Sequence, residues 1–147
     1  MPALVKNGHL YLAVPPLYRI SAGGKSYYAN DDQERAEILK KLHQSTDYSI
    51  YALTNWSGET FPVALQKFHF LSWFEGIVVS GDEKLVKPDP AIYKLLLERY
   101  GLDATTCVFI DDRADNVQAA VDLGFKGIPF SNGQQLHKEL QNLKVAI

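Results

Sequence analysis

The sequence predicts a three-layer α/β fold on a mainly parallel β-sheet, with a β-hairpin near the amino end. From residue 48 onward, short apolar strands alternate with helical patterns, and such alternation is typical of parallel sheets. Polar side chains also follow three of the predicted strands, and ligands of open α/β sheets bind outside the carboxyl ends of the strands. The 147 residues, 46% of them hydrophobic, are enough to form a single domain with its own core.

The amino-terminal part of the chain predicts β-structure followed by a helix. Residues 9–20 are rich in aromatic and branched side chains, which favour strands, and Pro15-Pro16 interrupts them. Two glycines at 23–24 provide the turn of a hairpin over 17–29. A helix is predicted over 32–44, because an Asn-Asp-Asp sequence offers a cap and apolar residues then recur at helical spacing.

The remaining two-thirds of the chain predicts four strands, each followed by a helical segment. Apolar runs place the strands, and apolar residues at i, i+3, i+4 spacing place the helices. Pro129 should put the last strand at an edge of the sheet, because proline cannot donate to a ladder. The strands are predicted over 48–53, 76–81, 107–110 and 127–130, and the helices over 59–70, over 90–100, from Asn116 to Gly124 with Val121 on its apolar face, and across Leu136, Leu140 and Leu143.

Polar groups at three strand ends form a candidate site for a phosphate and a divalent cation. Thr54 and Asn55 offer a hydroxyl and an amide that can donate to phosphate, and Lys87 can neutralise its charge. Asp111 and Asp112 follow a buried strand, and adjacent carboxylates repel one another unless a cation or a proton lies between them. Hard oxygen ligands of this kind favour Mg²⁺.

Each of these residues also has a purely structural interpretation. Thr54 can close the end of its strand, and Lys87 can be a solvated surface lysine. Asp112 or Asp115 can cap the helix that follows. By chance, all three features are less expected to occur together in this order along one chain than any one of them is to occur alone.

Composition narrows the classes of function. The formal net charge is −2 and no strongly basic stretch is present, which disfavours a nucleic-acid partner. No apolar run approaches the length of a membrane span and the first residues do not resemble a leader, so no membrane partner is expected. The single Cys107 is expected to be a buried apolar residue, and a chain without internal disulfides fits a reducing cytoplasm.

About residues 43–147 resemble the carboxyl-terminal half of the core of the haloacid dehalogenase (HAD) superfamily of phosphohydrolases. Leu53-Thr54-Asn55-Trp56-Ser57 is similar to the second motif of that superfamily. Val86-Lys87-Pro88-Asp89-Pro90-Ala91-Ile92-Tyr93 is similar to the third, the lysine motif. Phe109-Ile110-Asp111-Asp112, together with Asn116, is similar to the fourth, the acidic motif.

The resemblance implies a Rossmann-like sheet and a function for each motif. Thr54 or Asn55 and Lys87 would hold phosphate, and Asp112, helped by Asp111, would hold Mg²⁺. The first motif of the superfamily, an apolar strand followed by Asp-x-Asp, supplies the covalent nucleophile and a metal ligand.

That first motif is missing here. Upstream of the second motif the only aspartates are Asp31, Asp32 and Asp47, and none follows a long apolar strand in the required pattern. The best upstream strand, Leu10 to Val14, ends in Pro15-Pro16. We therefore expect no catalytic residue, and we expect Leu10 to Val14 to fill the central position in the sheet that the missing strand leaves.

About residues 2–35 resemble a different family, the B chains of the bacterial type II topoisomerases, DNA gyrase and topoisomerase IV. The stretch from Leu4 to Ile20, and then Gly24-Lys25-Ser26-Tyr27-Tyr28, is similar to the segment after the acidic cluster of the Toprim domain. The acidic cluster itself is missing. The chain is therefore interpreted as a chimera that forms one domain, with residues 1–36 derived from the topoisomerase and residues 37–147 from a HAD core.

The main functional hypothesis is a folded chimera without catalytic function that keeps a remnant of the phosphate site, with Mg²⁺ bound weakly or not at all. The first alternative is a Mg²⁺-dependent HAD phosphatase in which another group or water replaces the nucleophile. The second is a weakly DNA-binding topoisomerase fragment, for which Lys6, His9, Arg19 and Lys25 provide few phosphate contacts. A homodimer is expected, because the hairpin carries more apolar surface than it can bury alone.

Overall fold

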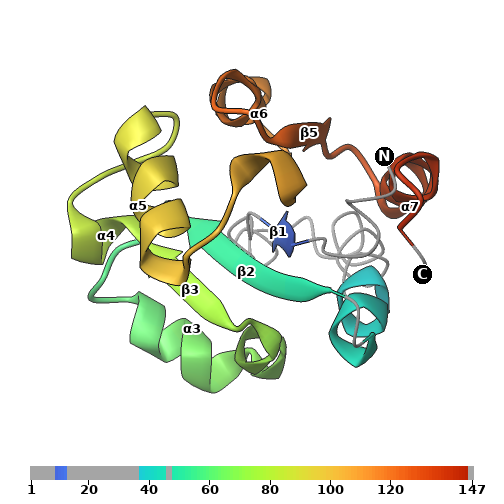
Figure 1. Ribbon diagram of the computed structural model, residues 1–147. Helices are drawn as coiled ribbons and strands as arrows, with labels where there is room; N and C mark the ends of the chain where they lie inside the picture. The colour runs from blue at the N-terminus through green and yellow to red at the C-terminus, as the bar shows by residue number, and fades with distance from the viewer. Residues whose placement is uncertain (1–8, 13–36, 46–47, 146–147) are drawn as a thin grey trace.

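The computed structural model describes residues 9–12, 37–45 and 48–145. The hairpin predicted over 17–29, and the first residues of the helix predicted over 32–44, lie outside this part of the chain. Figure 1 shows a central sheet with helices on both of its faces. The three-layer α/β class predicted from the sequence is therefore confirmed.

Five strands form one parallel sheet within the described residues. Their order across the sheet is β3-β2-β1-β4-β5, so the chain winds outward from the centre in both directions. The strand β5 lies at an edge, as Pro129 predicts. The strands are β1 (His9–Leu12), β2 (Ser49–Thr54), β3 (Gly76–Val79), β4 (Cys107–Asp111) and β5 (Lys126–Pro129).

The central strand β1 comes from the part of the sequence that precedes the HAD-like motifs. Leu10 is in register with Ile50 of β2 on one side and with Val108 of β4 on the other. An empty position between β2 and β4 would leave two rows of backbone groups unpaired, and β1 removes that cost. The prediction that the strand beginning at Leu10 fills this position is confirmed up to Leu12, where the described part of β1 ends.

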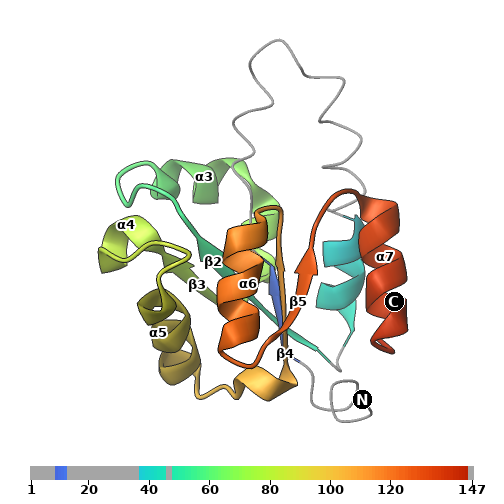
Figure 2. The same ribbon diagram turned by 90° about the horizontal axis from the view of Figure 1, so that it is seen from above.

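Helices cover both faces of the sheet. In Figure 1, α5 and α6 lie on one side, and α3 and a helix over residues 37–44 lie on the other. Figure 2 shows α7 beside the helix over 37–44. None of the described helices is both long and apolar enough to cross a bilayer. The helices are α3 (Phe61–Lys67), α4 (Ser80–Glu83), α5 (Pro90–Tyr100), α6 (Ala114–Asp122) and α7 (Gly133–Asn142), with 3₁₀ turns η2 (His69–Trp73) and η3 (Ala104–Thr106).

Alternation along the strands divides the core into two clusters, one on each face. Ile50 and Ala52 of β2 belong to the cluster formed with the helix over 37–44, α3 and α7, which we call the α3–α7 face. Tyr51 and Leu53 belong to the cluster formed with α5 and α6, which we call the α5–α6 face. Successive residues of a strand point to opposite faces, and a sheet covered on both faces therefore needs apolar residues throughout its strands.

Two predicted elements end earlier than the sequence pattern indicates. The helix predicted over 59–70 is α3 followed by η2, because Phe68 between them has an extended backbone (φ −114°, ψ 100°) and packs its ring against the α3–α7 face. The strand predicted over 76–81 stops at Val79, because Ser80 begins the short helix α4.

Helix α5 begins and ends where the sequence predicts. The Asp89 carboxylate accepts a hydrogen bond at its amino end, and Gly101 ends it with a left-handed backbone (φ 61°). In α6, the predicted apolar residue Val121 is 43% exposed. A methyl group of Val121 lies over Gly127 of β5, and this glycine has no side chain that could cover Val121.

Candidate functional site

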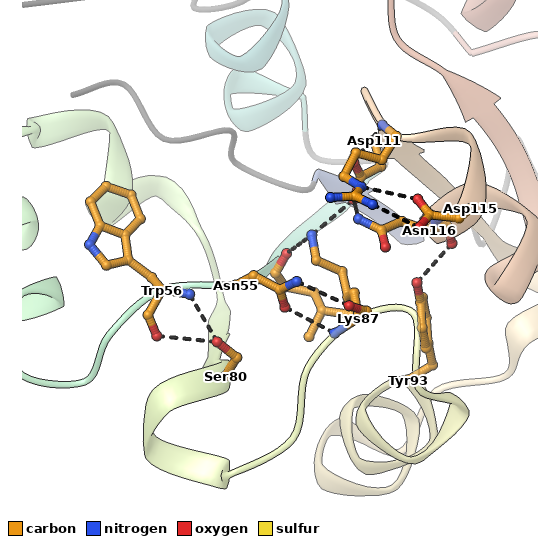
Figure 3. Close-up of polar contacts among 10 residues, drawn as sticks. Asn55, Trp56, Ser80, Lys87, Tyr93, Asp111, Asp115 and Asn116 are labelled. Atoms are coloured by element: carbon orange, nitrogen blue, oxygen red, sulfur yellow. Dashed lines mark hydrogen bonds and ion pairs between the residues drawn. The ribbon is translucent and has the colours of Figure 1, made fainter. Parts of the chain in front are cut away.

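Three segments that are far apart in the sequence meet beyond the carboxyl ends of β2 and β4 (Figure 3). Asn55 follows β2, Asp111 is the last residue of β4, and Lys87 lies in the loop between α4 and α5. The Lys87 Nζ donates to the Leu53 carbonyl oxygen (2.9 Å) and to Asp111 Oδ2 (2.9 Å). The structure therefore brings together one residue from each of the three sequence motifs.

The ion pair between Lys87 and Asp111 is buried, with side chains 5% and 3% exposed. Burial lowers the pKa of Lys87, and the Asp111 carboxylate offsets part of that effect. Burial opposes ionisation of Asp111 as well, but the Lys87 ammonium holds the pKa of Asp111 below its ordinary value. Each charge compensates the other in surroundings of low dielectric, so Lys87 is not the solvated surface lysine of the structural interpretation.

Asn55 uses both ends of its amide to hold the backbone of Lys87. Its Oδ1 accepts from the Lys87 N–H (2.9 Å), and its Nδ2 donates to the Lys87 carbonyl oxygen (3.2 Å). Thr54, the other phosphate candidate, is buried at the end of β2. Asn55 therefore positions the lysine in this structure, and the side chain of Lys87 is the part of the pair that carries charge.

The two adjacent aspartates have different surroundings. Asp111 accepts from the Arg113 N–H (2.9 Å) at Oδ1, and from Asn116 Nδ2 (3.0 Å) as well as Lys87 at Oδ2. Asp112 is exposed, yet partial desolvation and the neighbouring Asp111 raise its pKa. It does not cap the following helix, because α6 has Arg113 at its N-cap without a side-chain hydrogen bond there.

The HAD resemblance implies Mg²⁺ at this edge, and the described donors provide only part of a site for it. Asp112 offers carboxylate oxygens, and the buried Asn116 Oδ1 has no hydrogen-bond partner among the described residues; both are oxygen ligands of the kind that Mg²⁺ prefers. Asp111 already accepts from protein donors at both oxygens. Within the described ranges no three histidine, cysteine, aspartate or glutamate side chains gather to hold a metal ion. This donor set does not complete a Mg²⁺ site.

Tyr93 is a site residue that the sequence pattern did not reveal. The pattern places it among the apolar residues of α5, and it is fully buried. Its hydroxyl nevertheless donates to the Asn116 carbonyl oxygen (2.7 Å), and burial raises its pKa. Tyr93 thereby fixes the first turn of α6 beside Asp111. The sequence signals for this role are its place at the end of the lysine motif and a hydroxyl at a position where the helix buries its side chains.

The loop after β2 is held by a second set of contacts that the sequence analysis also missed. The Trp56 N–H donates to Ser80 Oγ (2.9 Å), and the Ser80 hydroxyl donates to the Trp56 carbonyl oxygen (3.2 Å). The Gly81 N–H donates to the same oxygen (2.9 Å). A Cβ at Gly81 would lie 2.8 Å from that oxygen, so only glycine allows this approach. Asn55 is therefore presented from a fixed loop.

Sequence comparison assigns the family. The family model of haloacid dehalogenase-like hydrolases matches residues 16–124. The chain belongs to the haloacid dehalogenase-like hydrolase family. The HAD match begins within residues 1–36, which the sequence analysis attributes to the topoisomerase, so the two resemblances overlap there.

Individual relatives agree with this membership. The chain is 32% identical over 118 residues to flavin mononucleotide hydrolase 1 of Arabidopsis thaliana, covering 76% of this chain and 44% of that one. A HAD family enzyme of Bacteroides thetaiotaomicron in a magnesium complex superposes with a TM-score of 0.60 at 27% identity, over 69% of this chain and 53% of that one. The chain thus spans about half the length of these HAD relatives.

The topoisomerase resemblance is separate and local. The chain is 46% identical over 68 residues to the B chain of DNA topoisomerase 4 of Rickettsia bellii, covering 46% of this chain and 10% of that one. The shares matched by this topoisomerase and by the flavin mononucleotide hydrolase together exceed the length of the chain, so the two matched stretches overlap. Both families named from the sequence are therefore confirmed as similarities.

Proposed function

We propose that this chain does not hydrolyse phosphoesters through a covalent aspartyl intermediate, and that its HAD-like edge binds phosphate weakly without turnover. One observation carries the proposal. The strand β1 occupies the centre of the sheet between β2 and β4, and the sequence directly after Leu12 is Ala13-Val14-Pro15-Pro16, which contains no carboxylate. Removing a covalent nucleophile lowers the rate of such enzymes by orders of magnitude.

Phosphate binding is supported by the chemistry of Lys87. An ammonium group has three N–H donors, and Leu53 and Asp111 accept two of them, which leaves one for an anion. Binding should be weak for the same reason, because Asp111 already neutralises the lysine and Asp112 repels an anion. A HAD relative from Bacteroides thetaiotaomicron is described in a magnesium complex. Mg²⁺ held weakly by Asp112 and by the unpartnered Asn116 Oδ1 would lessen the repulsion in this chain.

The experiment measures turnover and binding on the same samples. Hydrolysis of p-nitrophenyl phosphate and of flavin mononucleotide is followed with Mg²⁺, and inorganic phosphate binding is followed by calorimetry. We expect no turnover above background, and weak phosphate binding that strengthens in Asp112→Asn. Asp115→Asn is the matched control, because Asp115 is an exposed carboxylate in the first turn of α6 that is paired with Arg113.

The alternative is a Mg²⁺-dependent phosphatase, which the flavin mononucleotide hydrolase relative favours. Turnover that Asp112→Asn abolishes and Asp115→Asn preserves would establish this alternative and overturn the proposal. Ala13→Asp tests the reasoning in the other direction. It restores a carboxylate one residue after the described end of β1, and Mg²⁺-dependent turnover in this variant alone would show that the missing nucleophile is the cause of inactivity.

DNA binding by the topoisomerase-like part is the third possibility. It would appear as a mobility shift of a DNA duplex that weakens steeply as salt is raised, because phosphate contacts release counterions. We expect no shift at physiological salt.

We also propose that the chain forms a homodimer. The hairpin lies outside the described part of the chain, but exposed apolar side chains also support a dimer: Leu65 and Val86 are 46% and 55% exposed. Phe61 does not add to this surface, because it is buried against the Trp56 ring. Light scattering at several concentrations should give twice the 16.5 kDa of one chain; a single-chain mass throughout would contradict the dimer.

A further inference from the structure

A groove along α3 points to a second binding site, and we propose that it binds a flat aromatic anion. The groove has a volume of about 490 Å³, which is in the range of small-molecule pockets. The groove adjoins the phosphate edge, because Asn55 is among its described lining residues, but Figure 3 shows the Trp56 side chain directed away from Lys87. The described residues that form its walls include Trp56, Thr60, Val63, Ala64, Lys67 and Phe68.

The indole of Trp56 forms one wall and is held in a fixed orientation. Its Nε1 donates to Thr60 Oγ1 (3.0 Å), and its ring meets Phe61 edge to face with centroids 5.5 Å apart. The backbone on which it stands is fixed by Ser80. A wall that is already ordered loses little conformational entropy when a ligand binds, and this favours binding to a ring over binding to a flexible chain.

Among the described lining residues only Lys67 is charged, and it lies at the end of the groove opposite Trp56. The Lys67 ammonium lies 5.8 Å from the centroid of the Phe68 ring. Lys67 lies seven residues after Thr60, which corresponds to about 10 Å along the helix axis. No acidic side chain is among the described residues that line the groove. An occupant with a negative group at one end and a ring at the other matches this arrangement in charge and in length.

The middle of the groove is apolar and open. Val63 is 62% exposed although it lies between the indole and the lysine, and Ala64 beneath it leaves space because its side chain is small. Aromatic ligands stack on indole and phenyl rings, and such contacts contribute beyond the area they bury. The combination of two aromatic walls, an apolar floor and one cation specifies an aromatic carboxylate or sulfonate.

The test uses anilinonaphthalene sulfonate, a flat aromatic anion, and the full chain. The protein has two tryptophans, so Trp73→Phe leaves Trp56 as the only tryptophan that can transfer energy to the probe. We expect saturable binding with quenching of Trp56. Lys67→Gln should weaken binding about fivefold, as expected for the loss of one exposed charge contact. Lys94→Gln, an exposed lysine of α5, should have no effect.

A second pair of variants keeps the test independent of folding. Val63→Glu places a carboxylate four residues before Lys67, where the two form a helical ion pair that stabilises α3 and removes the cation from the ligand. Leu65→Glu is the matched control, because Leu65 is exposed on the same helix but does not line the groove. We expect Val63→Glu to weaken binding at least fivefold and Leu65→Glu to leave it within twofold.

Each remaining outcome would overturn the proposal. Equal weakening by both glutamate variants would show general adhesion to apolar surface, and unchanged binding in Val63→Glu would exclude the groove. Equal affinity for the uncharged probe phenylnaphthylamine would exclude a role for Lys67. Displacement of the sulfonate by inorganic phosphate would place it at the Lys87 edge and end the claim of a separate site, whatever the outcome of the phosphatase assays.

Discussion

The two faces of the sheet are completed by different parts of the chain. On the α5–α6 face, the buried residues that the structure describes lie between Tyr51 and Phe125. Tyr93, Phe109 and Phe125 contact one another there, with ring centroids 5.2, 6.3 and 6.0 Å apart. The α3–α7 face instead needs Ile38, Leu39 and Leu42, from the helix over 37–44.

The difference lies in how far along the chain each face draws its residues. The described buried residues of the α5–α6 face come from β2 onward, and this face also holds the polar site in place. The α3–α7 face needs in addition the helix over 37–44, which precedes β2. The backbone ladder of β1 requires no particular side chain, because backbone groups of any sequence can pair. The side chains of the α3–α7 face, by contrast, must fit one another closely.

The largest effect is expected on the α5–α6 face. Phe109→Ala should lower the free energy of unfolding by about 3–5 kcal/mol, because it leaves a cavity at the centre of the aromatic group. Phe109 is fully buried, and the Lys87 ammonium lies 5.9 Å from its ring centroid. Urea denaturation measures the change. A loss below about 1 kcal/mol would mean that the aromatic contacts of the α5–α6 face contribute little to stability.

Breaking the ion pair on that same face should have the next largest effect. Lys87→Met leaves Asp111 buried without its counter-charge and should cost about 3 kcal/mol at neutral pH. The pKa of Asp111 is lowered in the folded state, so its ionisation contributes stability above the ordinary aspartate pKa, which is lost as pH falls through the lowered value. The destabilisation by Lys87→Met should therefore shrink in acid. The double variant with Asp111→Leu should be more stable than Lys87→Met alone, and a less stable double variant would contradict the pairing.

On the α3–α7 face, Leu42→Ala should cost about 2–3 kcal/mol. Leu42 is fully buried in the helix over 37–44, and Leu140→Ala in α7 is the matched control within the same cluster. Similar losses in the two variants, measured by thermal and urea unfolding, would show that the helix over 37–44 is as well packed as α7. A negligible loss only in Leu42→Ala would show that the helix over 37–44 is weakly packed on this face.

The smallest effect concerns the polar edge itself. The pKa of Asp112 is raised in the folded state, mainly by desolvation and then by Asp111. Folding therefore favours the protonated form, and the stability this contributes is present below the ordinary aspartate pKa and lost as pH rises through the raised value. Asp112→Asn should be more stable than the natural chain at neutral pH by less than about 1 kcal/mol, and the difference should disappear in acid. Unfolding measured across this pH range checks the sign.

Much of the fold follows from local pattern. The apolar run before Asp111 and the helical spacing after Pro90 indicate their elements correctly, because periodicity and capping residues act over a few neighbouring positions. The meeting of Asn55, Lys87 and Asp111 is also predictable, since the ends of parallel strands lie along one edge. The sequence predicts these residues as a group, and the structure contains that group.

The ends of helices and strands, and the partners of polar side chains, depend on contacts with residues that are distant in the sequence. Phe68 leaves the helix because its ring reaches the core, and Ser80 turns out of the strand to bind the backbone of Trp56. Tyr93 looks like any apolar helix residue until its hydroxyl is placed against α6. No spacing rule distinguishes these outcomes, because each depends on atoms contributed by a distant segment.

By itself, then, the sequence determined that strands and helices alternate, that three motifs share an edge and that no aspartate follows the first strand. Only the tertiary structure decided the register of β1 against β2 and β4, that Asn55 holds the Lys87 backbone, and that Lys87 is neutralised by Asp111. The physical reason is the sequence distance over which each effect acts. Backbone preference and amphipathic period depend on neighbouring residues. The partner of a buried charge depends instead on which distant groups the completed fold brings within hydrogen-bond distance of it.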